Sequence, residues 1–466
     1  MKNAHGWGKT IICLMIMCSI FASLFPNIAF AETRTSTYYS EAARDGYIAK
    51  WGRPYPPSQH TDVSTAYNIL IGQWREKDTT QPGYIYGIER GYISFDTSSI
   101  PNTAIITSVR LKLKTKSDYS VRDFTMEVRG GQQPIYGSSL DAADWGRGTT
   151  IVATWTTANY PGNDRYIDLS IPSGQVNVAG RTQFELKSNL EGTSPTVDEE
   201  VVFYSGDSTG KPYLEVTWRR RAYAVLIAGG GDAANNYARY WNDLMFLYDA
   251  LTTQYQLTAA NVYVLYANGQ PPSASNCNDS ANAVAHANVI DFAATTNNLQ
   301  TVFTTLSTTM TSEDFLFVHC NDHGTSSSGH SYLVLWGTSL RDDYFAGANY
   351  LGRVTNYYRE VIVMKQCYSG GFINDLTNTR RVVTTSCTDT QVSWACDTEG
   401  NYGEFTYYWI SAVFWHTPTG APVDADTNND NLVSMTEAFT YARDRDSQPE
   451  TPQFNDLGNI GSTTYL

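Results

Sequence analysis

Two short apolar segments, each followed by polar and small residues, constrain the fold of this chain more than any other feature. Residues 315–320 lead into His323, and residues 361–364 lead into Cys367. Apolar runs of this length are typical of strands buried in a parallel sheet. In open α/β sheets, reactive groups lie just past the carboxyl ends of such strands. The pattern therefore predicts a thiol and an imidazole close together at one edge of a sheet.

Glycines flank both of these side chains. Gly324 follows His323, and Gly370 and Gly371 lie shortly after Cys367. A thiolate that attacks a peptide carbonyl needs main-chain N–H groups aimed at the oxyanion, and glycine lets the main chain come that close. We therefore expect Cys367 to be the nucleophile and His323 the general acid and base, with the N–H groups of Gly324 and Cys367 as oxyanion donors.

Structural roles are the alternative reading of these residues. A cysteine at the end of an apolar strand is often a small buried hydrophobe, and His319 and His323 could both be core or loop histidines. Order, spacing and flanking glycines together favour catalysis, and His323 is the better base because His319 still belongs to the strand. Asp322 is a poor orienter, since neighbouring side chains on an extended segment diverge. No third catalytic side chain is evident.

The same residues resemble a known family. His-Gly after one strand and Gln-Cys-x-Ser-Gly-Gly after the next look like the caspase-like cysteine peptidases, most closely the legumain-type branch. The cysteine follows the histidine by 44 residues, close to the offset of about 50 in caspases. The resemblance covers residues 223–466 and implies an α/β caspase-like domain with a mainly parallel sheet. It also implies that the substrate side chain before the scissile bond (P1) contacts Arg239, Ser393, Trp394 and Glu404.

Lys365 departs from the family pattern. Two residues before the nucleophile, legumain-type enzymes carry an acid and caspases a Gln, whereas this chain has a lysine. A second cation beside Arg239 favours an acidic P1 side chain by charge complementarity, unless Lys365 merely pairs with Glu404. The expected P1 residue is therefore Asn or Asp, and the sequence leaves that choice open.

Alternating strand and helix patterns predict the rest of the α/β domain. Strands are expected at 223–228, 262–266 and 381–386, and helical spacing recurs at 239–248 and around 289–307. This succession is the signature of a parallel sheet with helices on both faces. The three glycines at 229–231 lack the spacing of a dinucleotide-binding turn.

Residues 32–218 show short alternating segments and turn residues, but no long helical periodicity. Apolar and basic residues alternate strictly at 109–114, as in a strand with one buried face. Many such strands predict an all-β sandwich, jelly-roll-like in its connections. Residues 90–96, 106–111 and 211–216 resemble the DNRLRE family of bacterial surface and secreted modules, which implies a binding or spacer role and cell-surface polysaccharide as a candidate partner. Trp145 and Trp155 are candidates for stacking on sugars, although core packing is the commoner role.

Residues 1–31 have the pattern of an export signal. Lys2 and Lys9 accompany an apolar stretch at 11–25, and Ala29-Phe30-Ala31 is a small-x-small cleavage site. The apolar stretch is too short for a comfortable membrane span, and no other stretch could span a bilayer. We therefore expect a secreted or cell-surface protein. The formal charge of −14 argues against nucleic acid as a partner.

Five cysteines remain beyond the expected signal: Cys277, Cys320, Cys367, Cys387 and Cys396. An odd count in an exported protein leaves one thiol unpaired, as a nucleophile requires. Cys387 and Cys396 are close enough in sequence to form a disulfide, although sequence alone cannot fix the pairing. Residues 219–222, which begin with three arginines, are interpreted as a solvated basic linker between two domains, with a processing site as the alternative.

Residues 426–437 are arranged as an EF-hand-type calcium loop. Side-chain oxygens stand at positions 1, 3, 5, 9 and 12, and position 7 offers its carbonyl. Position 6, usually glycine, is Asn431, which tolerates a positive φ. We expect a structural Ca²⁺, with an ion-free acidic loop as the alternative. The expected ligands are Asp426, Asn428, Asp430, Leu432, Ser434 and Glu437.

Together these patterns predict an exported cysteine endopeptidase that acts on protein or peptide substrates. One alternative is a transpeptidase or transamidase of the same fold, because an amine can capture the acyl-enzyme in place of water. The other is a catalytically inactive protein that binds a surface or a glycan.

Overall fold

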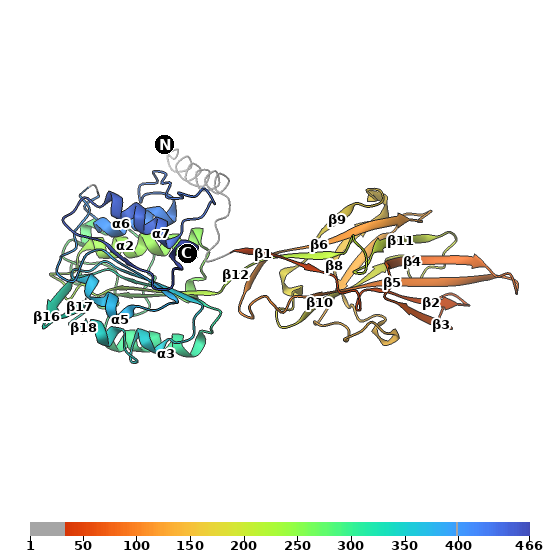
Figure 1. Ribbon diagram of the computed structural model, residues 1–466, viewed down its shortest axis with the longest axis horizontal. Coiled ribbons are helices and arrows are strands. Elements are labelled where there is room, and N and C mark those ends of the chain that lie inside the picture. The colour runs from red at the N-terminus through yellow and green to blue at the C-terminus, as the bar shows by residue number, and fades with distance from the viewer. Residues whose placement is uncertain (1–32, 398) are drawn as a thin grey trace, which may run out of the picture. The chain divides into compact units, whose positions relative to one another are not determined.

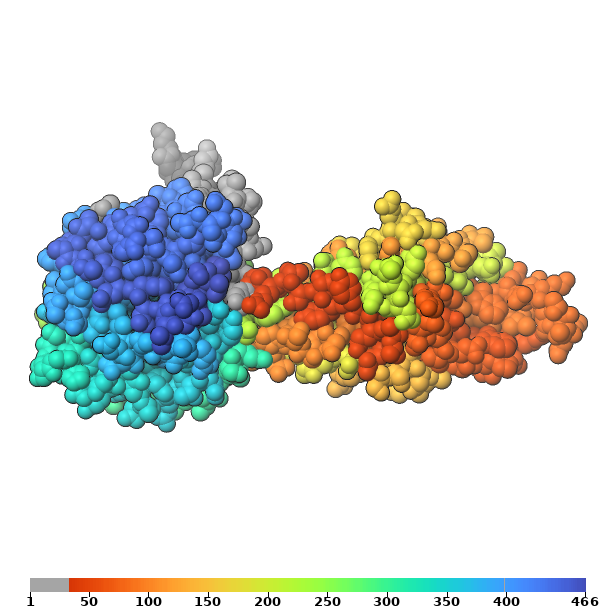
Figure 2. Space-filling view, in the orientation of Figure 1, coloured from red at the N-terminus to blue at the C-terminus, as the bar shows by residue number. Residues whose placement is uncertain are grey.

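The computed structural model describes residues 33–397 and 399–466, so the expected export signal at 1–31 lies outside the described residues. The described chain divides into two compact units, Thr33–Arg219 and Arg220–Leu466. In Figures 1 and 2 the first unit runs from red to yellow-green and the second from green to blue. No helix within the described residues is both long enough and apolar enough to cross a bilayer.

The N-terminal unit is built from antiparallel strands. Those in the described residues join one sheet that curls around an apolar core, as a half-barrel, and the predicted all-β region is confirmed. In β6 the buried side chains are Val109, Leu111 and Leu113, whereas the basic residues between them reach solvent, as their alternation predicts. The strands are β1 (Arg34–Tyr39), β2 (Gly46–Gly52), β3 (His60–Ser64), β4 (Asn68–Lys77), β5 (Tyr84–Asp96), β6 (Ile105–Asp118), β7 (Thr125–Gly130), β8 (Thr150–Thr156), β9 (Tyr166–Ser170), β10 (Arg181–Ser188), β11 (Glu199–Tyr204) and β12 (Tyr213–Arg219).

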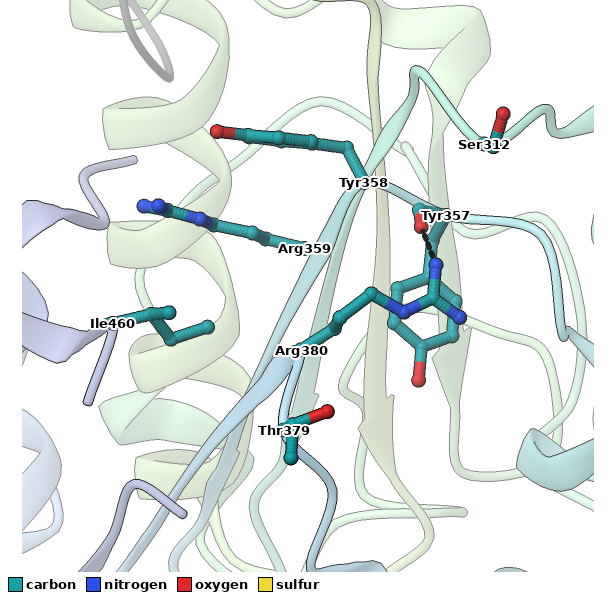
Figure 3. A pocket seen from close by; sticks show the side chains of 7 residues that line it. All are labelled: Ser312, Tyr357, Tyr358, Arg359, Thr379, Arg380 and Ile460. Carbon is teal, nitrogen blue, oxygen red and sulfur yellow. Dashed lines mark hydrogen bonds between the residues drawn. The ribbon is translucent and has the colours of Figure 1, made fainter. Parts of the chain in front are cut away.

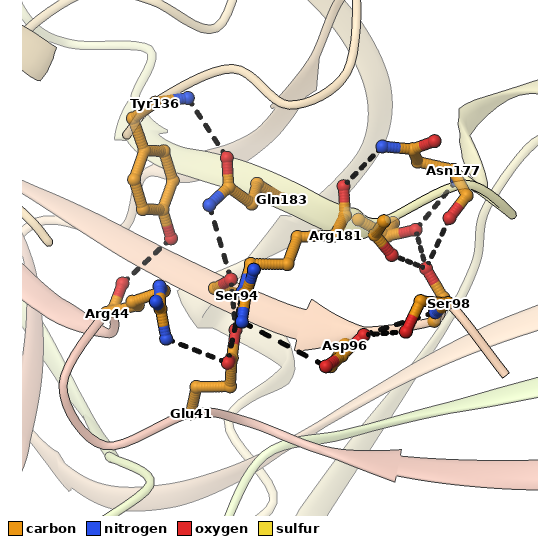
Figure 4. Close-up of polar contacts among 12 residues, drawn as sticks. Glu41, Arg44, Ser94, Asp96, Ser98, Tyr136, Asn177, Arg181 and Gln183 are labelled. Carbon is orange, nitrogen blue, oxygen red and sulfur yellow. Dashed lines mark hydrogen bonds and ion pairs between the residues drawn. The ribbon is translucent and has the colours of Figure 1, made fainter. Parts of the chain in front are cut away.

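A polar network centred on Glu41 ties the loop after β1 to β5 and β10 (Figure 4). The Glu41 carboxylate accepts hydrogen bonds from Arg44 (2.9 Å), from Arg181 (2.9 Å) and from the hydroxyl of Ser94 (2.8 Å). Charge-assisted bonds of this kind are roughly twice as strong as neutral ones. The network therefore fixes the start of the unit to strands more than 50 residues away in the chain, because Ser94 and Arg181 lie on β5 and β10.

The two tryptophans considered for sugar stacking are both partly buried and pack against core clusters. Lys50 and Arg90 place their cationic groups 4.5 and 4.2 Å from the ring centroid of Trp145. Trp155 meets Phe203 edge-on, with ring centroids 5.8 Å apart, at the margin of the core. Both indoles therefore have packing contacts, and their stacking on sugars stays a prediction.

The three arginines between the units are not a solvated loop. Arg219 is the last residue of β12 and is buried, and β13 begins at Ala222. Arg221 forms an ion pair with the buried Asp314 at 2.7 Å, and Arg220 donates to the carbonyl of Glu313 at 3.1 Å. These residues are therefore held in place, because Arg219 is buried and Arg220 and Arg221 bind partners just before β15.

The C-terminal unit is an α/β domain, and its predicted mainly parallel sheet is confirmed. The strand order is β14-β13-β15-β19-β20-β21, with every neighbouring pair parallel except β20 and β21. The strands of this sheet are β13 (Ala222–Ala228), β14 (Val262–Tyr266), β15 (Phe315–Cys320), β19 (Arg359–Met364), β20 (Arg381–Thr385) and β21 (Gln453–Asn455).

Helices cover both faces of this sheet (Figure 1). Alternate residues of β13 explain why: Ala224 and Leu226 pack under one group of helices, and Val225 and Ile227 under the other. A strand buried on both sides needs an almost continuous apolar run, which 222–228 supplies. One face carries α2 (Ala238–Asp249), α6 (Glu404–Phe414) and α7 (Met435–Arg445), and the other α3 (Thr296–Thr309), α4 (Asp342–Phe345) and α5 (Ile373–Leu376).

Two local features differ from the sequence-based expectation. Helix α3 begins only at Thr296, because Asp291 and Phe292 bond to the edge of β14: the Asp291 carboxylate accepts the N–H of Val264 at 2.8 Å. A small antiparallel sheet also follows His323, where the sequence indicated no strands. It consists of β16 (Gly324–Ser327), β17 (His330–Leu335) and β18 (Thr338–Arg341).

Candidate active site

His323 and Cys367 lie at the carboxyl ends of two adjacent parallel strands. In the register of β15 and β19, Cys320 is opposite Met364, and the two functional residues each lie three positions further on. Gly324 packs directly against the main chain of Cys367: a Cβ atom there would collide with the Cys367 carbonyl. The loops that carry the predicted base and nucleophile therefore touch, and only glycine fits at this contact.

The imidazole of His323 is held by a main-chain carbonyl. Its Nε2 lies 2.9 Å from the carbonyl oxygen of Asn235. A carbonyl can only accept, so Nε2 carries the hydrogen and Nδ1 remains the basic nitrogen. The rings of Tyr237 and Tyr240 meet the imidazole edge-on, with centroids 5.8 and 5.4 Å away. The carbonyl of Asn235 thus orients the imidazole. The sequence did not reveal this role, because it does not depend on the Asn235 side chain.

Electrostatics keep His323 neutral. Burial lowers its pKa from the ordinary value, the Asn235 carbonyl opposes this, and the cations of Arg239 and Lys365 lower it further. A neutral imidazole can accept the thiol proton.

Asp322 supports the site through the main chain. Its buried carboxylate accepts the N–H of His323 at 2.6 Å and that of Gly230, in the turn after β13. Burial raises the pKa of Asp322 to about 7, and these N–H donors act to lower it. The carboxylate therefore ties the turn that leads to Asn235 to the loop that carries His323, while remaining off the imidazole.

The Cys367 thiol is partly exposed and faces the segment after β20. The N–H of Ser393 points at Sγ from 3.3 Å, and Tyr368, the next residue, has a left-handed φ of 60°. Cys320, Cys277 and Cys387 are buried, and burial raises the pKa of each. Among the cysteines of the described chain, Cys367 is the one that combines exposure with a neighbouring imidazole loop.

The expected disulfide between Cys387 and Cys396 is wrong. Cys387 is a free thiol, and its Sγ lies 3.3 Å from the carbonyl of Gln391 and 3.6 Å from that of Gln366. Cys396 belongs instead to the apolar core on the α2 and α6 face. His319 is likewise structural: it is fully buried, its Nδ1 faces the Val363 carbonyl at 3.1 Å, and burial lowers its pKa to about 3.

Two of the expected substrate-binding residues form a cationic wall. The guanidinium of Arg239 lies over the rings of Tyr237 and Tyr240, at 4.1 and 4.7 Å from their centroids, and donates to the Tyr240 hydroxyl at 3.0 Å. The ammonium of Lys365 lies 5.4 Å from the Tyr240 centroid. Lys365 is only 2% exposed, and burial followed by repulsion from Arg239 lowers its pKa. Both cations therefore lie against the ring of Tyr240.

Buried acids lie on the other side of Lys365. Glu404 accepts from the N–H and the hydroxyl of Ser447 at 3.0 and 2.8 Å through one oxygen, and no donor in the described chain reaches its other oxygen. Glu450 is 8% exposed and lies beside the Ser393 hydroxyl and the Trp394 N–H, and neither of its oxygens has a hydrogen bond of ordinary geometry among the described residues. Burial, then repulsion from Asp446, raises its pKa to about 8. No sequence motif marks Glu450, since it lies beyond α7, far from the other site residues in the chain.

The remaining expected contact residues lie near these groups. Trp394 is 42% exposed, and its carbonyl accepts the N–H of Glu404 at 3.1 Å. Ser393, whose N–H points at the Cys367 Sγ, has its buried hydroxyl beside the carboxyl of Glu450.

The expected calcium loop is folded around its own carboxylates. Asp426 accepts the N–H groups of Asp430 (3.2 Å) and Asn431 (2.7 Å), and Asn431 takes a φ of 65°. Glu437 accepts from Thr427 through one oxygen and from Ser434 through the other, and Ser434 caps α7. The polar ends of 426–437 thus converge, as an oxygen-ligated cation requires.

A second group could also hold a metal: His330, Asp342 and Asp343, whose ligand atoms lie within 4.8 Å of one another. Its oxygens are already occupied. Asp342 accepts the N–H groups of Ser331 and Asp343, both at 2.8 Å, and Asp343 forms a two-point ion pair with Arg341. These contacts give the group a structural role, because they tie the start of α4 to β17 and β18.

A small depression of about 250 Å³ lies at the opposite end of the strands, around the start of β19 (Figure 3). It is lined in part by Arg359 and Arg380, but both guanidinium groups are bound to main-chain carbonyls, those of Thr463 and Tyr357. Its lining includes neither His323 nor Cys367.

This arrangement of a cysteine and a histidine on adjacent parallel strands, in a sheet covered by helices on both faces, defines a caspase-like fold. A family model described as the Peptidase C13 family matches residues 222–460. The match covers more than half of the chain, and the chain belongs to this family. The matched residues lie in the C-terminal unit, so the DNRLRE-type resemblance of the N-terminal unit stays a prediction.

Two solved structures resemble about half of the chain. One is a protein from Geobacter sulfurreducens, 13% identical with a TM-score of 0.34, which covers 50% of this chain and 92% of its own. The other is caspase-1 from Spodoptera frugiperda, 11% identical with a TM-score of 0.32, which covers 51% of this chain and 87% of its own. No curated protein matches the chain.

Proposed function

We propose that this chain is an exported cysteine endopeptidase in which Cys367 is the nucleophile and His323 the general acid and base. The observation that supports it best is the contact of Gly324 with the Cys367 main chain, together with the bond from His323 to Asn235. They support the proposal because one orients the imidazole and the other brings together the loops that carry His323 and Cys367. Family membership supports cysteine peptidase activity on protein substrates.

The reaction follows from these positions. Nδ1 of His323 accepts the thiol proton, and the Cys367 thiolate attacks the scissile carbonyl. The N–H groups of Gly324 and Cys367 stabilise the oxyanion. The imidazolium then protonates the departing amine, which leaves a thioester on Cys367. Water, deprotonated by His323, hydrolyses this thioester and restores the thiol.

The P1 pocket of the proposed enzyme is lined by charges of both signs. Arg239 and Lys365 supply cations, and Glu404 and Glu450 supply carboxyl groups that each keep at least one oxygen without a hydrogen bond of ordinary geometry. The cations suit the oxygen of an Asn or Asp side chain, and a carboxylate suits the N–H₂ of Asn. Ser393 and Trp394 form the wall next to the nucleophile. We therefore propose Asn or Asp at P1, with the balance set by the protonation of the acids.

The test is turnover of a P1-scanning fluorogenic peptide library by the wild type and by Cys367→Ala. Cys320→Ala is the matched control, because it removes a buried thiol from the strand that precedes His323. The proposal requires that the wild type and Cys320→Ala cleave and that Cys367→Ala does not. Cleavage that survives in Cys367→Ala would overturn it. Products that carry an added amine would instead identify a transpeptidase, and silence of all three proteins would favour the inactive binding protein.

We also propose that loop 426–437 holds a structural Ca²⁺. The side chains of Asp426, Asn428, Asp430, Ser434 and Glu437 and the carbonyl of Leu432 would supply oxygen ligands, which hard cations prefer. In support, Asn431 takes the positive φ that the sharp turn needs, and Asp426 already gathers the N–H groups of the turn. Such an ion would fix the loop that leads into α7.

A further inference from the structure

The N-terminal unit contains a pair of facing carboxyl groups on neighbouring strands. Glu89 of β5 is directly opposite Gly72 of β4, and Gly72 is directly opposite Glu200 of β11. Directly opposed residues of antiparallel strands share one face of the sheet, so both glutamates project from the same side. Gly72 places no side chain between them, and the two carboxyl groups come within hydrogen-bonding range of each other.

Glu200 of this pair lines a depression of about 490 Å³, which is a volume that small-ligand sites commonly have, and Glu89 lies behind it. Aromatic rings form part of its wall: Trp74, and Tyr119, which is 59% exposed. The side chains that line it are Trp74, Arg75, Glu76, Tyr119, Asp198 and Glu200. With Glu89 behind Glu200, the acids outnumber the one arginine, whose guanidinium lies over Tyr84 at 4.5 Å.

Glu89 lacks a full set of partners. It is 7% exposed, and one oxygen accepts the indole N–H of Trp74 at 3.3 Å. Apart from the neighbouring carboxyl of Glu200, no N–H or O–H donor of the described residues reaches the other oxygen. A buried carboxyl oxygen without a donor carries a desolvation penalty that a bound cation or donor would remove. The same face therefore combines excess negative charge, an unsatisfied acceptor and aromatic surface.

We propose that this depression binds an organic cation, namely a primary ammonium group on an alkyl stem, which is the chemistry of a lysine side chain. The ammonium supplies three donors to Glu89 and Glu200, and the stem lies along Trp74 and Tyr119, where a cation is also attracted to the ring faces. A metal ion fits less well, because among the described residues no three carboxylate ligand atoms around this depression lie within 4.8 Å of one another. A neutral sugar would stack on the rings but leave the carboxylate charge uncompensated.

Binding of this kind displaces a proton. Burial first, and then repulsion from Glu200, raises the pKa of Glu89 to about 8, so its carboxyl holds a proton at neutral pH. When the ammonium enters, that proton passes to the buffer. The titratable groups that face Glu89 are Glu200 of β11 and Tyr47 of β2, with Asp62 of β3 and Asp198 beyond them. All of these are acids, so they favour the cation further.

The test is calorimetric titration of full-length Cys367→Ala protein with Nα-acetyl-lysine N-methylamide, and separately with 1,5-diaminopentane. The first probe represents a peptide side chain and the second a free polyamine, and the tighter of the two identifies the source. We expect Kd to fall about tenfold per pH unit between pH 6 and 8, as the release of one proton requires. The titration is repeated in two buffers of different ionisation enthalpy. The difference between the two binding enthalpies gives the number of protons released, on protein with an intact pocket.

Variants then locate the site. Glu200→Gln and Glu89→Gln should weaken binding by tenfold or more, and Glu215→Gln, a control on β12, should not. The norleucine analogue of the first probe should not bind. The proposal fails if neither amine binds, if the glutamine variants bind as well as the control, or if norleucine, glucose or Ca²⁺ binds at the same site with equal strength. All of these outcomes are independent of peptidase activity.

Discussion

The Nε2 of His323 donates to the main-chain carbonyl of Asn235 at 2.9 Å, and the turn before Asn235 is bound by the carboxylate of Asp322. The orientation of the proposed base is therefore set by backbone position rather than by a third catalytic side chain. Geometry of this kind contributes to rate by holding reacting groups in a productive arrangement.

Asp322→Asn should lower kcat by about tenfold or more while KM changes little, because the substitution weakens the bonds that position the Asn235 carbonyl but removes no expected substrate contact. Asn235→Ala is the control and should stay within about twofold of wild type, since its carbonyl remains. The measurement is kcat and KM of the two variants and the wild type on one peptide substrate. Equal losses in both would show that the Asn235 side chain takes part.

Gly324→Ala should abolish turnover, because its methyl group would push the Cys367 carbonyl and separate base from nucleophile. Gly400→Ala is the matched control in the same unit, since a Cβ there meets only the Cys396 carbonyl at an ordinary 3.9 Å. Thermal unfolding of both proteins separates a folding defect from a catalytic one. A fully active Gly324→Ala protein would contradict the contact.

The acid limb of kcat/KM should lie below pH 6.5, because His323 must be neutral to accept the thiol proton and its pKa is lowered. Activity is lost as the pH falls through that pKa. Lys365→Met removes one repelling cation, so the acid limb should move to higher pH. The rate of Cys367 alkylation by iodoacetamide follows the same protonation without involving P1. An unmoved profile would mean that Lys365 does not influence the imidazole.

Glu450 should make P1 preference depend on pH. Its raised pKa, about 8, leaves the carboxyl neutral at pH 6 and ionised at pH 9. The ratio of kcat/KM for Asp over Asn peptides should therefore fall as pH rises, since an ionised Glu450 repels an Asp side chain and accepts from the Asn amide. In Glu450→Gln this ratio should become nearly independent of pH. A ratio that still falls in Glu450→Gln would assign the effect to another group.

Ca²⁺ should raise the melting temperature of the wild type by several degrees at concentrations well above Kd, because a ligand that binds only the folded state stabilises it. Glu437→Gln should remove this shift, and Asp444→Asn, an exposed acid on α7, should keep it. Differential scanning calorimetry with and without a chelator measures both. Burial acts to raise the pKa of Glu437, but the bonds from Ser434 and Thr427 lower it, so the carboxylate stays charged at neutral pH.

The sequence predicted the features that are carried by residue type and short-range pattern. The apolar runs before His323 and Cys367 indicated parallel strands, and β15 and β19 are adjacent in the sheet. The alternation at 109–114 likewise indicated a half-buried strand, as β6 is. Such signals are local, so a single chain suffices to detect them.

The sequence could not indicate features that depend on main-chain atoms or on contacts between distant segments. The role of Asn235 lies in a carbonyl that every residue possesses. Glu450 reaches Ser393 only because the segment after α7 folds back on the catalytic edge. Glu89 and Glu200 meet because three strands align in register, which no spacing in the sequence encodes. The prediction of a helix from about residue 289 was wrong at its start for the same reason, since Phe292 pairs with Leu265 of β14.

The sheet of the C-terminal unit ends in β21, a strand of only three residues that runs antiparallel to β20. An edge this short offers few N–H and C=O groups to an additional strand, which is one way in which proteins suppress edge-to-edge aggregation. Two copies of this chain that tried to merge their sheets at β21 would therefore find little backbone to pair.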